Sequence, residues 1–151
     1  MSPMDKAVKI KNKRVSFEYF LLEKYNAGLV LTGTEIKSIR QGKVNLTDAF
    51  CVVVKDELWI KQMHISEYSF GNINNHDPKR ERKLLLTKRE LKKIIYKSKD
   101  VGITIVPTLL YINEKGLAKI EIAIAKGKKL YDKRETLKQN EIKREIDRGA
   151  N

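Results

Sequence analysis

Ile103-Thr-Ile-Val-Pro-Thr-Leu-Leu-Tyr-Ile112 is a run of β-branched and large apolar residues, and the turn sequence Asn113-Glu-Lys-Gly116 follows it. The next segment, Leu117-Ala-Lys-Ile-Glu-Ile-Ala-Ile-Ala125, carries isoleucine at every second position from Ile120 to Ile124. Alternation with a period of two is typical of a strand that buries one of its faces. The two segments therefore predict a β-hairpin, and they make strands the main component of the fold.

A helix is predicted just before this hairpin. Thr87-Lys-Arg-Glu90 has the form of a capping box, in which the threonine hydroxyl and the glutamate carboxylate each accept from a backbone amide. The helix that begins here extends to about Ser98, with an apolar buried face and a basic exposed face. The buried face has Leu91, Ile94 and Ile95, and the exposed face has Arg89, Lys93 and Lys97.

The earlier part of the chain predicts further short elements. They are a strand at 17–25, a turn at 26–28, a strand at 29–31, a helix at 35–41 capped by Thr34, a hairpin of 49–54 with 58–63, and an irregular polar segment at 66–82. Short strands with a helix between hairpins favour a mainly β, α+β architecture: a small antiparallel OB-type β-barrel with about three flanking helices and a basic C-terminal tail. We expect a flexible basic N-terminus at 1–11, the barrel at 12–126 and the tail at 127–151.

Positive charge is concentrated in three segments of the chain, whose formal net charge is +13 over 151 residues. Residues 1–14 carry five basic and one acidic side chain, residues 79–99 carry ten basic and two acidic, and residues 126–151 carry nine basic and five acidic. The remainder is mildly acidic. This distribution favours a partner that carries phosphate groups, and a solvated basic surface without a dedicated partner is the alternative.

The tail is poor in apolar side chains. Residues 136–151 contain only Leu137, Ile142, Ile146 and Ala150. Such a segment buries too little surface to offset its ordering entropy, so we expect it to be disordered alone and helical when a partner holds it. Tyr131 is surrounded by charged neighbours, and an exposed ring among cations can stack on a base.

No pattern in the sequence indicates catalysis or a bound metal. His64 and His76 are the two histidines and Cys51 is the one cysteine, so no zinc-binding set is present. We expect structural roles for both histidines and a buried apolar role for Cys51. The prediction is a protein that is not an enzyme and needs no cofactor, with an RNA-processing nuclease as the alternative.

The chain shows no membrane or export signal. No segment approaches the roughly 20 apolar residues of a membrane-spanning helix, and the charged N-terminus has no apolar run behind it. A single cysteine cannot form an intrachain disulfide, which is typical of a reducing compartment. We therefore expect a cytoplasmic protein.

Four motifs, in this order along the chain, resemble the SmpB family, the bacterial SsrA-binding proteins. They are Asn12-Lys-Arg14, Gly33-Thr-Glu-Ile-Lys-Ser-Ile-Arg40, Gly71-Asn-Ile-Asn-Asn-His-Asp-Pro-Lys-Arg-Glu-Arg-Lys-Leu-Leu-Leu86 and Ala125-Lys-Gly-Lys-Lys-Leu-Tyr-Asp-Lys-Arg-Glu135. The resemblance extends from Asn12 to about Arg148.

The resemblance implies an OB-type barrel that binds the tRNA-like domain of tmRNA, the SsrA RNA. It implies delivery of alanyl-tmRNA, with elongation factor Tu and GTP, to stalled 70S ribosomes for trans-translation. The tail would form a helix in the empty mRNA channel and contact 16S rRNA at the decoding centre. The protein would act as a monomer, away from membranes, and a different ribosome- or tRNA-binding OB-type module is the alternative.

The resemblance also implies residue roles. The RNA-binding positions would be Asn12, Lys13, Arg14, Asn26, Glu35, Lys37, Arg40, Leu85 and Lys119. The positions at the decoding centre would be Gly127, Lys128, Lys129, Tyr131, Asp132, Lys133 and Arg134. Many members carry Glu at the position of Asn26, and an amide keeps the hydrogen-bonding capacity but loses the charge. Some carry His at the position of Tyr131, and both rings can stack.

Overall fold

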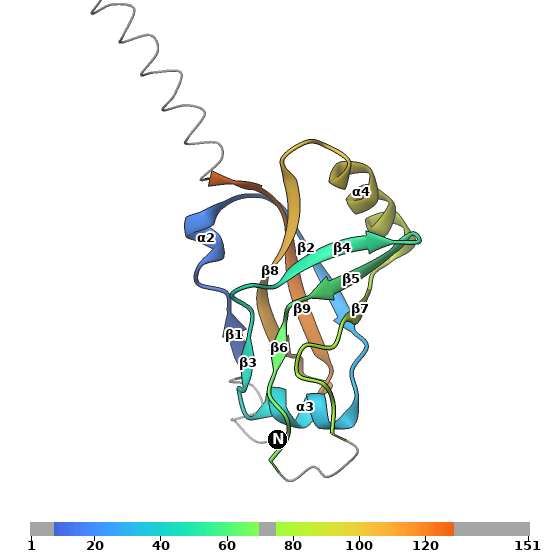
Figure 1. Cartoon of the computed structure of the whole chain (residues 1–151). Coiled ribbons are helices and arrows are strands. Elements are labelled where there is room, and N and C mark those ends of the chain that lie inside the picture. Colours follow the sequence, from blue (N-terminus) through green and yellow to red (C-terminus); the bar gives the residue numbers. More distant parts are fainter. Residues whose placement is uncertain (1–7, 70–74, 129–151) are drawn as a thin grey trace, which may run out of the picture.

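The computed structural model of the chain describes residues 8–69 and 75–128, and it is mainly β (Figure 1). In chain order the elements are β1 (Lys9–Lys11), α2 (Val15–Glu18), β2 (Tyr19–Leu29), α3 (Gly33–Arg40), β3 (Val44–Asn45), β4 (Phe50–Val54), β5 (Glu57–Lys61), β6 (His64–Ile65), β7 (Arg82–Leu85), α4 (Lys88–Ser98), β8 (Ile103–Ile112) and β9 (Ala118–Gly127). The expected fold class, with strands dominant and three flanking helices among the described residues, is confirmed. No described helix is long and apolar enough to cross a membrane.

The strands of the described chain close into a barrel. Their order is β1-β8-β4-β5-β7-β2-β9, and an additional pairing of β9 with β8 closes the sheet on itself. All of these pairings are antiparallel. β1 lies outside the closure and adds a short strand to β8, while β3 and β6 pair separately.

The sequence predicted a long hairpin, and the structure confirms it as the antiparallel pair of β8 and β9. Its register aligns Ile112 with Ala118 and Ile103 with Lys126, with a bulge between Pro107 and Leu109. The Asn113 side chain holds the turn, because its Oδ1 accepts from the amides of Lys115 and Leu117 at 3.0 and 2.9 Å. Gly116 lies in the same turn with a φ of +80°, a conformation that a residue with a Cβ rarely adopts.

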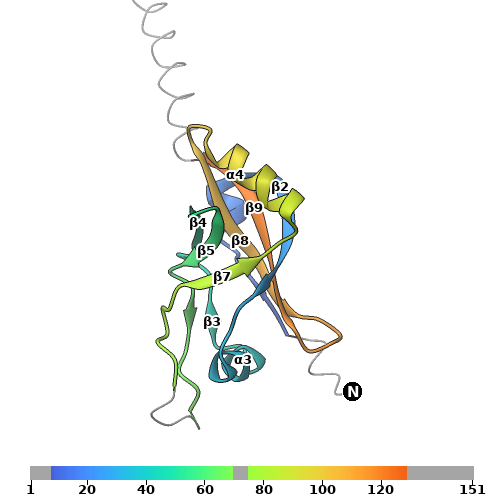
Figure 2. The same cartoon turned by 90° about the vertical axis from the view of Figure 1, so that its right-hand side faces the viewer.

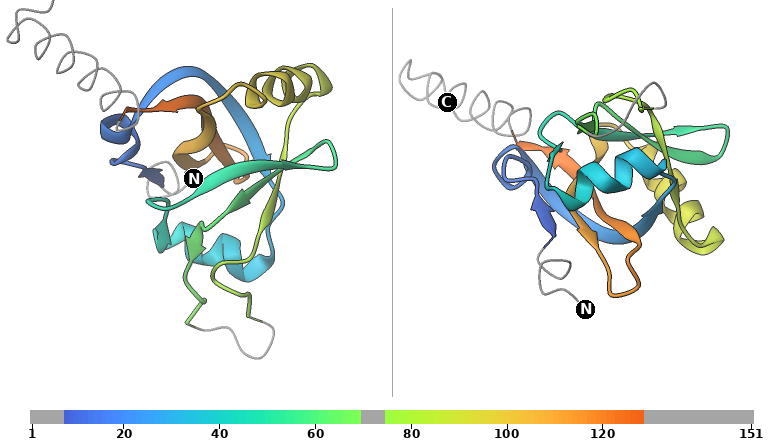
Figure 3. Two further views of the ribbon diagram at one scale, coloured as in Figure 1. Left: turned by 45° about the horizontal axis from the view of Figure 1, so that its top comes forward. Right: turned by 90° about the horizontal axis from the view of Figure 1, so that it is seen from below.

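The two longer helices lie at opposite ends of the barrel (Figure 2). Seen from below, α3 crosses one end (Figure 3). α4 packs against β8 and β9 near the other end, where its Ile94 is completely buried. The predicted capping box of α4 is confirmed, with Thr87 as the N-cap and Glu90 as its reciprocal partner.

The prediction for 17–31 was wrong in two respects. Phe17 belongs to the helix α2, and β2 continues through 26–28 without a turn. Pairing explains the continuity, because Gly28 aligns with Lys119 of β9 on one side and with Leu85 of β7 on the other. Two neighbouring strands hold the Asn-Ala-Gly sequence extended, although its local preference is for a turn.

The cap of α3 also differs from the prediction. Thr32, rather than Thr34, is the N-cap, and it forms a capping box with Glu35. The spacing of three residues between a threonine and a glutamate is the signature of that motif, and Thr32 satisfies it. Thr34 instead contacts His76, with 2.9 Å between its Oγ1 and the histidine Nδ1.

The segment 66–82 was predicted to be irregular, yet its last residue begins the strand β7. The sequence of β7 does not show the alternation of apolar and polar residues that is typical of a strand, because a buried arginine, Arg82, occupies one of its inward positions. Leu84, the other inward residue of β7, packs in the core.

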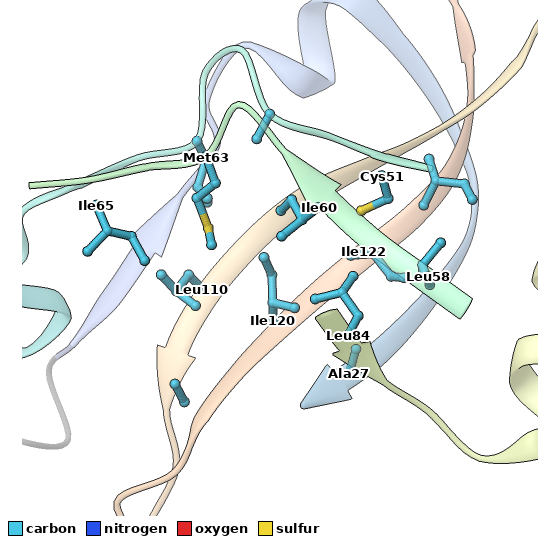
Figure 4. Packing of buried hydrophobic residues seen from close by; sticks show 14 of the residues in the cluster. Ala27, Cys51, Leu58, Ile60, Met63, Ile65, Leu84, Leu110, Ile120 and Ile122 are labelled. Carbon is cyan, nitrogen blue, oxygen red and sulfur yellow. The ribbon is translucent and has the colours of Figure 1, made fainter. Parts of the chain in front are cut away.

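Aliphatic side chains from every strand of the barrel wall fill its interior (Figure 4). Ile60, Leu110 and Ile120 are completely inaccessible to solvent. Cys51 is buried among them as predicted, and burial raises the pKa of its thiol. The core thus fixes the barrel wall, whose outer face is free to carry function.

Candidate nucleic-acid interface

A row of side chains crosses five neighbouring strands on the outer face of the barrel. The register aligns Lys9 with Tyr111, Tyr111 with Lys119, Lys119 with Gly28, and Gly28 with Leu85. Residues directly opposite each other in a sheet project from the same face. We call this set the cross-strand row. It places two lysines, a tyrosine and a leucine on a single surface.

Gly28 lacks a side chain, and this allows its neighbours in the cross-strand row to approach each other. A Cβ at this position would lie 3.5 Å from the Leu85 Cβ and 3.6 Å from the Lys119 Nζ. Leu85 and Lys119 therefore come together over the bare backbone of Gly28. Leu85 is half exposed although it is a large apolar residue, so it offers a contact surface to a partner.

Asn26 lies next to the row on β2 and is held by Tyr111. The tyrosine hydroxyl donates to the Asn26 Oδ1 at 3.2 Å, across the intervening strand β9. On that strand Glu121 is aligned with Asn26 and forms an ion pair with Lys24 at 3.3 Å. The amide of Asn26 is therefore oriented by a protein contact and keeps its NH₂ group as a donor.

Arg40 reaches the turn of the β8–β9 hairpin from the end of α3. Its Nη2 lies 3.7 Å from the position that a Cβ of Gly116 would occupy. This places an exposed guanidinium close to the start of β9, which carries Lys119. Lys37, on the same helix, lies over the ring of Tyr68, with its Nζ 5.4 Å from the ring centre.

Glu35 is inside the fold rather than on this surface. Its carboxylate is completely buried and accepts from Arg80 Nη2 and from Arg82 Nε, both at 2.5 Å. The Thr32 amide donates to the same carboxylate at 2.8 Å. Arg82, also fully buried, donates on to the carbonyl oxygen of Met63 at 2.6 Å.

Burial and neighbouring charges shift the pKa values of Glu35 and Arg82 in this network. Burial alone raises the pKa of the Glu35 carboxyl, but hydrogen bonds from Arg80, Thr32 and Arg82 outweigh it and lower the pKa below the ordinary value. Burial lowers the pKa of Arg82, and the attraction of Glu35 opposes that change. The pair stays ionised, and it ties α3 to β7 beneath the interface.

Asn12 is also buried, next to β1. Its Nδ2 donates to the carbonyl oxygens of Leu46 and Pro107, each at 3.0 Å, and its backbone amide donates to the Thr108 carbonyl oxygen at 2.9 Å. Its Oδ1 is buried without a hydrogen-bond partner among the described residues. The side chain thereby fixes the start of the Asn12-Lys-Arg14 motif.

Lys13 and Arg14 follow on the surface. Arg14 forms an ion pair with Glu18 at 2.7 Å. Lys13 and Asn12 line an open cavity of about 490 Å³, whose wall also includes the ring of Phe17. This cavity adjoins the outer face of β8 and β9, because Leu109 and Glu121 contribute to it.

The chain leaves the barrel at the end of β9. Gly127 is the last residue of that strand, one residue beyond the boundary predicted for the barrel. Lys128 donates to the Ser16 carbonyl oxygen at 2.9 Å, and its Nζ lies 5.1 Å from the ring centre of Phe20. The predicted decoding-centre residues Lys129, Tyr131, Asp132, Lys133 and Arg134 lie outside the described residues.

The structure thus gathers Asn26, Arg40, Leu85 and Lys119 near one another and places Glu35 and Asn12 behind the surface. Tyr111 and Lys9 were missed from the sequence. The outward alternation of the predicted hairpin could have identified Tyr111, because it shares a face with Lys119. Lys9 depends on a three-residue strand that carries almost no periodic signal.

His76 has the structural role expected of it. Its Nε2 lies 2.8 Å from the Ile65 carbonyl oxygen and its Nδ1 contacts Thr34, so both ring nitrogens are used within the fold. Across the described ranges, no group of three or more His, Cys, Asp or Glu side chains is arranged to hold a metal ion.

Comparison with known proteins gives a consistent result. The family model described as SmpB protein matches residues 9–151. The SsrA-binding protein of Phocaeicola vulgatus is 60% identical over 141 residues, covering 93% of this chain and 94% of that protein. The SsrA-binding protein of Parabacteroides distasonis is 59% identical over 142 residues, covering 94% and 93%.

A solved structure shares the fold as well. It is described as "tmRNA-SmpB: a journey to the center of the bacterial ribosome", and its matching chain is 42% identical with a TM-score of 0.69. The match covers 80% of this chain and 84% of that one. The matching family model, the identities and the shared fold agree with the motifs, and the chain belongs to the SmpB family.

Proposed function

We propose that this protein binds tmRNA and acts in trans-translation, the rescue of stalled ribosomes. The observation that carries the proposal is the cross-strand row, found in a chain of the SmpB family. Lysines, an aromatic ring and an exposed leucine on one sheet face are the groups that hold an RNA backbone and its unstacked bases. The relatives are named for binding the SsrA RNA.

The tRNA-like domain of tmRNA would bind across the row. Lys119 and Arg40 would contact phosphates, while Leu85 and Tyr111 would pack against sugars or bases. Asn26 would contribute its free amide hydrogens. Glu35 and Asn12 would act from behind by fixing α3 and the N-terminal motif, with Lys13, Arg14 and Lys37 as peripheral cations.

The protein would deliver alanyl-tmRNA to the 70S ribosome as a monomer, together with elongation factor Tu and GTP. The segment from Gly127 onward would enter the vacant mRNA channel and contact 16S rRNA at the decoding centre. The anchoring of Lys128 on Ser16 and Phe20 supports this role, because it fixes the point from which the segment departs. In this role the protein supplies binding and position rather than a catalytic group.

A gel-shift comparison tests the proposal. Labelled tmRNA, bulk tRNA and ribosomal RNA are titrated with the full-length protein at one fixed salt concentration, because affinities for RNA depend strongly on salt. Markedly tighter binding of tmRNA is expected. Equal binding of all three RNAs would instead favour a general ribosome- or tRNA-binding barrel protein.

A further inference from the structure

Three lysines of α4 and its C-cap lack an ion-pair partner among the described residues. Lys88, Lys92 and Lys99 form no ion pair with any described residue. The same helix carries Lys97, which is ion-paired with Glu23 of β2. Lys83 on the neighbouring strand β7 is likewise paired, with Glu57. Arg89 and Lys93 of α4 also form no ion pair with a described residue, so what distinguishes the three lysines is their shared place on the surface.

These three lysines surround a groove of about 410 Å³ between α4 and the β4–β5 turn. Leu91 and Ile95 of the helix line it, and Asp56 of the turn closes the far side. Figure 3 shows the β4–β5 turn on the same side of the molecule as α4. We call this the α4 groove. It combines apolar walls with a rim that is predominantly cationic.

Tyr96 forms one wall of the α4 groove with its ring three-quarters exposed, at 75%. Its hydroxyl makes no hydrogen bond with the part of the chain that the structure describes. An aromatic ring beside several cations is the arrangement with which proteins stack the bases of single-stranded nucleic acid.

We propose that the α4 groove binds a single-stranded segment of ribosomal RNA, with one unstacked base against Tyr96 and the backbone phosphates along Lys88, Lys92 and Lys99. The surplus of positive charge favours a polyanion. An acidic peptide fits less well, because it could use the cations but carries no base to stack on the exposed ring of Tyr96.

The α4 groove is separate from the cross-strand row. None of the residues of the row lines the groove. Arg40, near the row, belongs to α3, which lies at the opposite end of the barrel (Figure 2). The side of α4 that carries Lys97 approaches β2 through Glu23, and Lys93 acts on the same carboxylate. We expect RNA bound on the row to leave the groove available to the ribosome, and the tmRNA gel shift described below tests this. The inference shares with the proposed function only the ribosome as partner.

The test compares two lysines of the same helix. Lys92→Ala removes a charge from the α4 groove, whereas Lys93→Ala removes an equal charge outside it. A second pair, Tyr96→Leu and Tyr96→Phe, removes or keeps the aromatic ring at an exposed position that the fold tolerates. Binding of a fluorescein-labelled oligouridylate and of purified ribosomal subunits is followed by anisotropy and by sedimentation, with a tmRNA gel shift in parallel.

We expect Lys92→Ala and Tyr96→Leu each to weaken oligouridylate and subunit binding by roughly tenfold, within the range for removing one stacked base or one phosphate interaction. Lys93→Ala and Tyr96→Phe should remain close to wild type, and tmRNA affinity should be unchanged in all four. Equal losses for both lysine variants, or no loss for Tyr96→Leu, would overturn the inference. So would displacement of the oligouridylate by a polyglutamate peptide at equal charge concentration.

The tmRNA gel shift separates the two ideas. Loss of tmRNA affinity in the groove variants would place tmRNA in the α4 groove and contradict the inference. A wild-type protein that binds oligouridylate through Tyr96 but does not prefer tmRNA would contradict the proposed function alone.

Discussion

The Arg82 Nε donates to the Glu35 carboxylate at 2.5 Å, and both side chains are completely inaccessible to solvent. A buried ion pair is weak evidence of net stabilisation, because desolvation of two charges offsets their attraction. Removal of one partner alone is costly, because the remaining charge is left buried without a counter-charge. The pair therefore connects the helix with Arg40 to the strand with Leu85, and it makes the surface geometry depend on the interior.

Glu35→Gln should destabilise the protein strongly. The amide keeps the shape of the side chain but leaves Arg82 without its counter-charge, so we expect a loss of about 3–5 kcal/mol in the free energy of unfolding. Urea denaturation followed by circular dichroism measures it. The matched control is Glu57→Gln, which breaks the exposed ion pair with Lys83 and should cost under about 1 kcal/mol. Similar losses of stability for both variants would contradict the larger contribution expected from the buried ion pair.

Stability should fall in acid as Glu35 becomes protonated. Its folded-state pKa is lowered relative to the unfolded chain. A lowered carboxyl pKa contributes stability that is complete above the unfolded value and is lost as the pH falls through the folded value. Urea titrations from neutral pH downward should therefore show the free energy of unfolding declining below the ordinary glutamate range. Glu35→Gln should show a shallower decline, and an identical slope in the variant would contradict the assignment.

Arg40→Ala and Lys119→Ala should each weaken tmRNA binding by about 1–2 kcal/mol, the size expected for one charge-assisted hydrogen bond. Both side chains lie at the surface, so the thermal melting curve should barely move. Lys126→Ala is the matched control, because Lys126 is an exposed lysine at the far end of β9. Gel shifts at several salt concentrations should also show the salt slope reduced by about 0.7 for each phosphate that is no longer neutralised. A large melting shift with normal tmRNA binding would assign these residues a structural role.

Deletion of residues 129–151 should separate tmRNA binding from ribosome rescue. The cut is placed after Lys128 because that residue packs on Ser16 and Phe20 and belongs to the folded body. We expect tmRNA affinity within a few-fold of wild type in a gel shift. Tagging of truncated products in a reconstituted translation system should be abolished. Full tagging by the truncated protein would disprove the role proposed for this segment.

Much of the fold could be predicted from sequence because its strongest signals are local. The isoleucine alternation of β9 and the Thr87–Glu90 capping box each need only a few neighbouring residues. β2 could not be predicted in the same way, because its continuity through Gly28 depends on pairing with Leu85 and Lys119, which are remote in sequence. The same reason explains why β7 was missed, since the counter-charge of its inward arginine is a carboxylate from α3, which is remote in sequence.

The candidate site was predicted in part for related reasons. Motif resemblance identified Asn26, Arg40, Leu85 and Lys119, and the structure gathers them, but it could not distinguish a surface residue from a buried support. Glu35 was grouped with the surface residues because sequence alone does not show that its oxygens face inward. Tyr111 was missed because its role depends on a neighbour two strands away, with β9 lying between them.

Closure of the barrel has a consequence for behaviour in concentrated solution. A strand with unpaired backbone groups is a template for self-association, and β9 has no such edge because it pairs with β2 on one side and with β8 on the other. β1 forms an outer edge of this sheet, and it is short and carries lysines at both ends. Such an edge repels a second copy of itself, so the protein can expose a long sheet face to RNA without inviting aggregation.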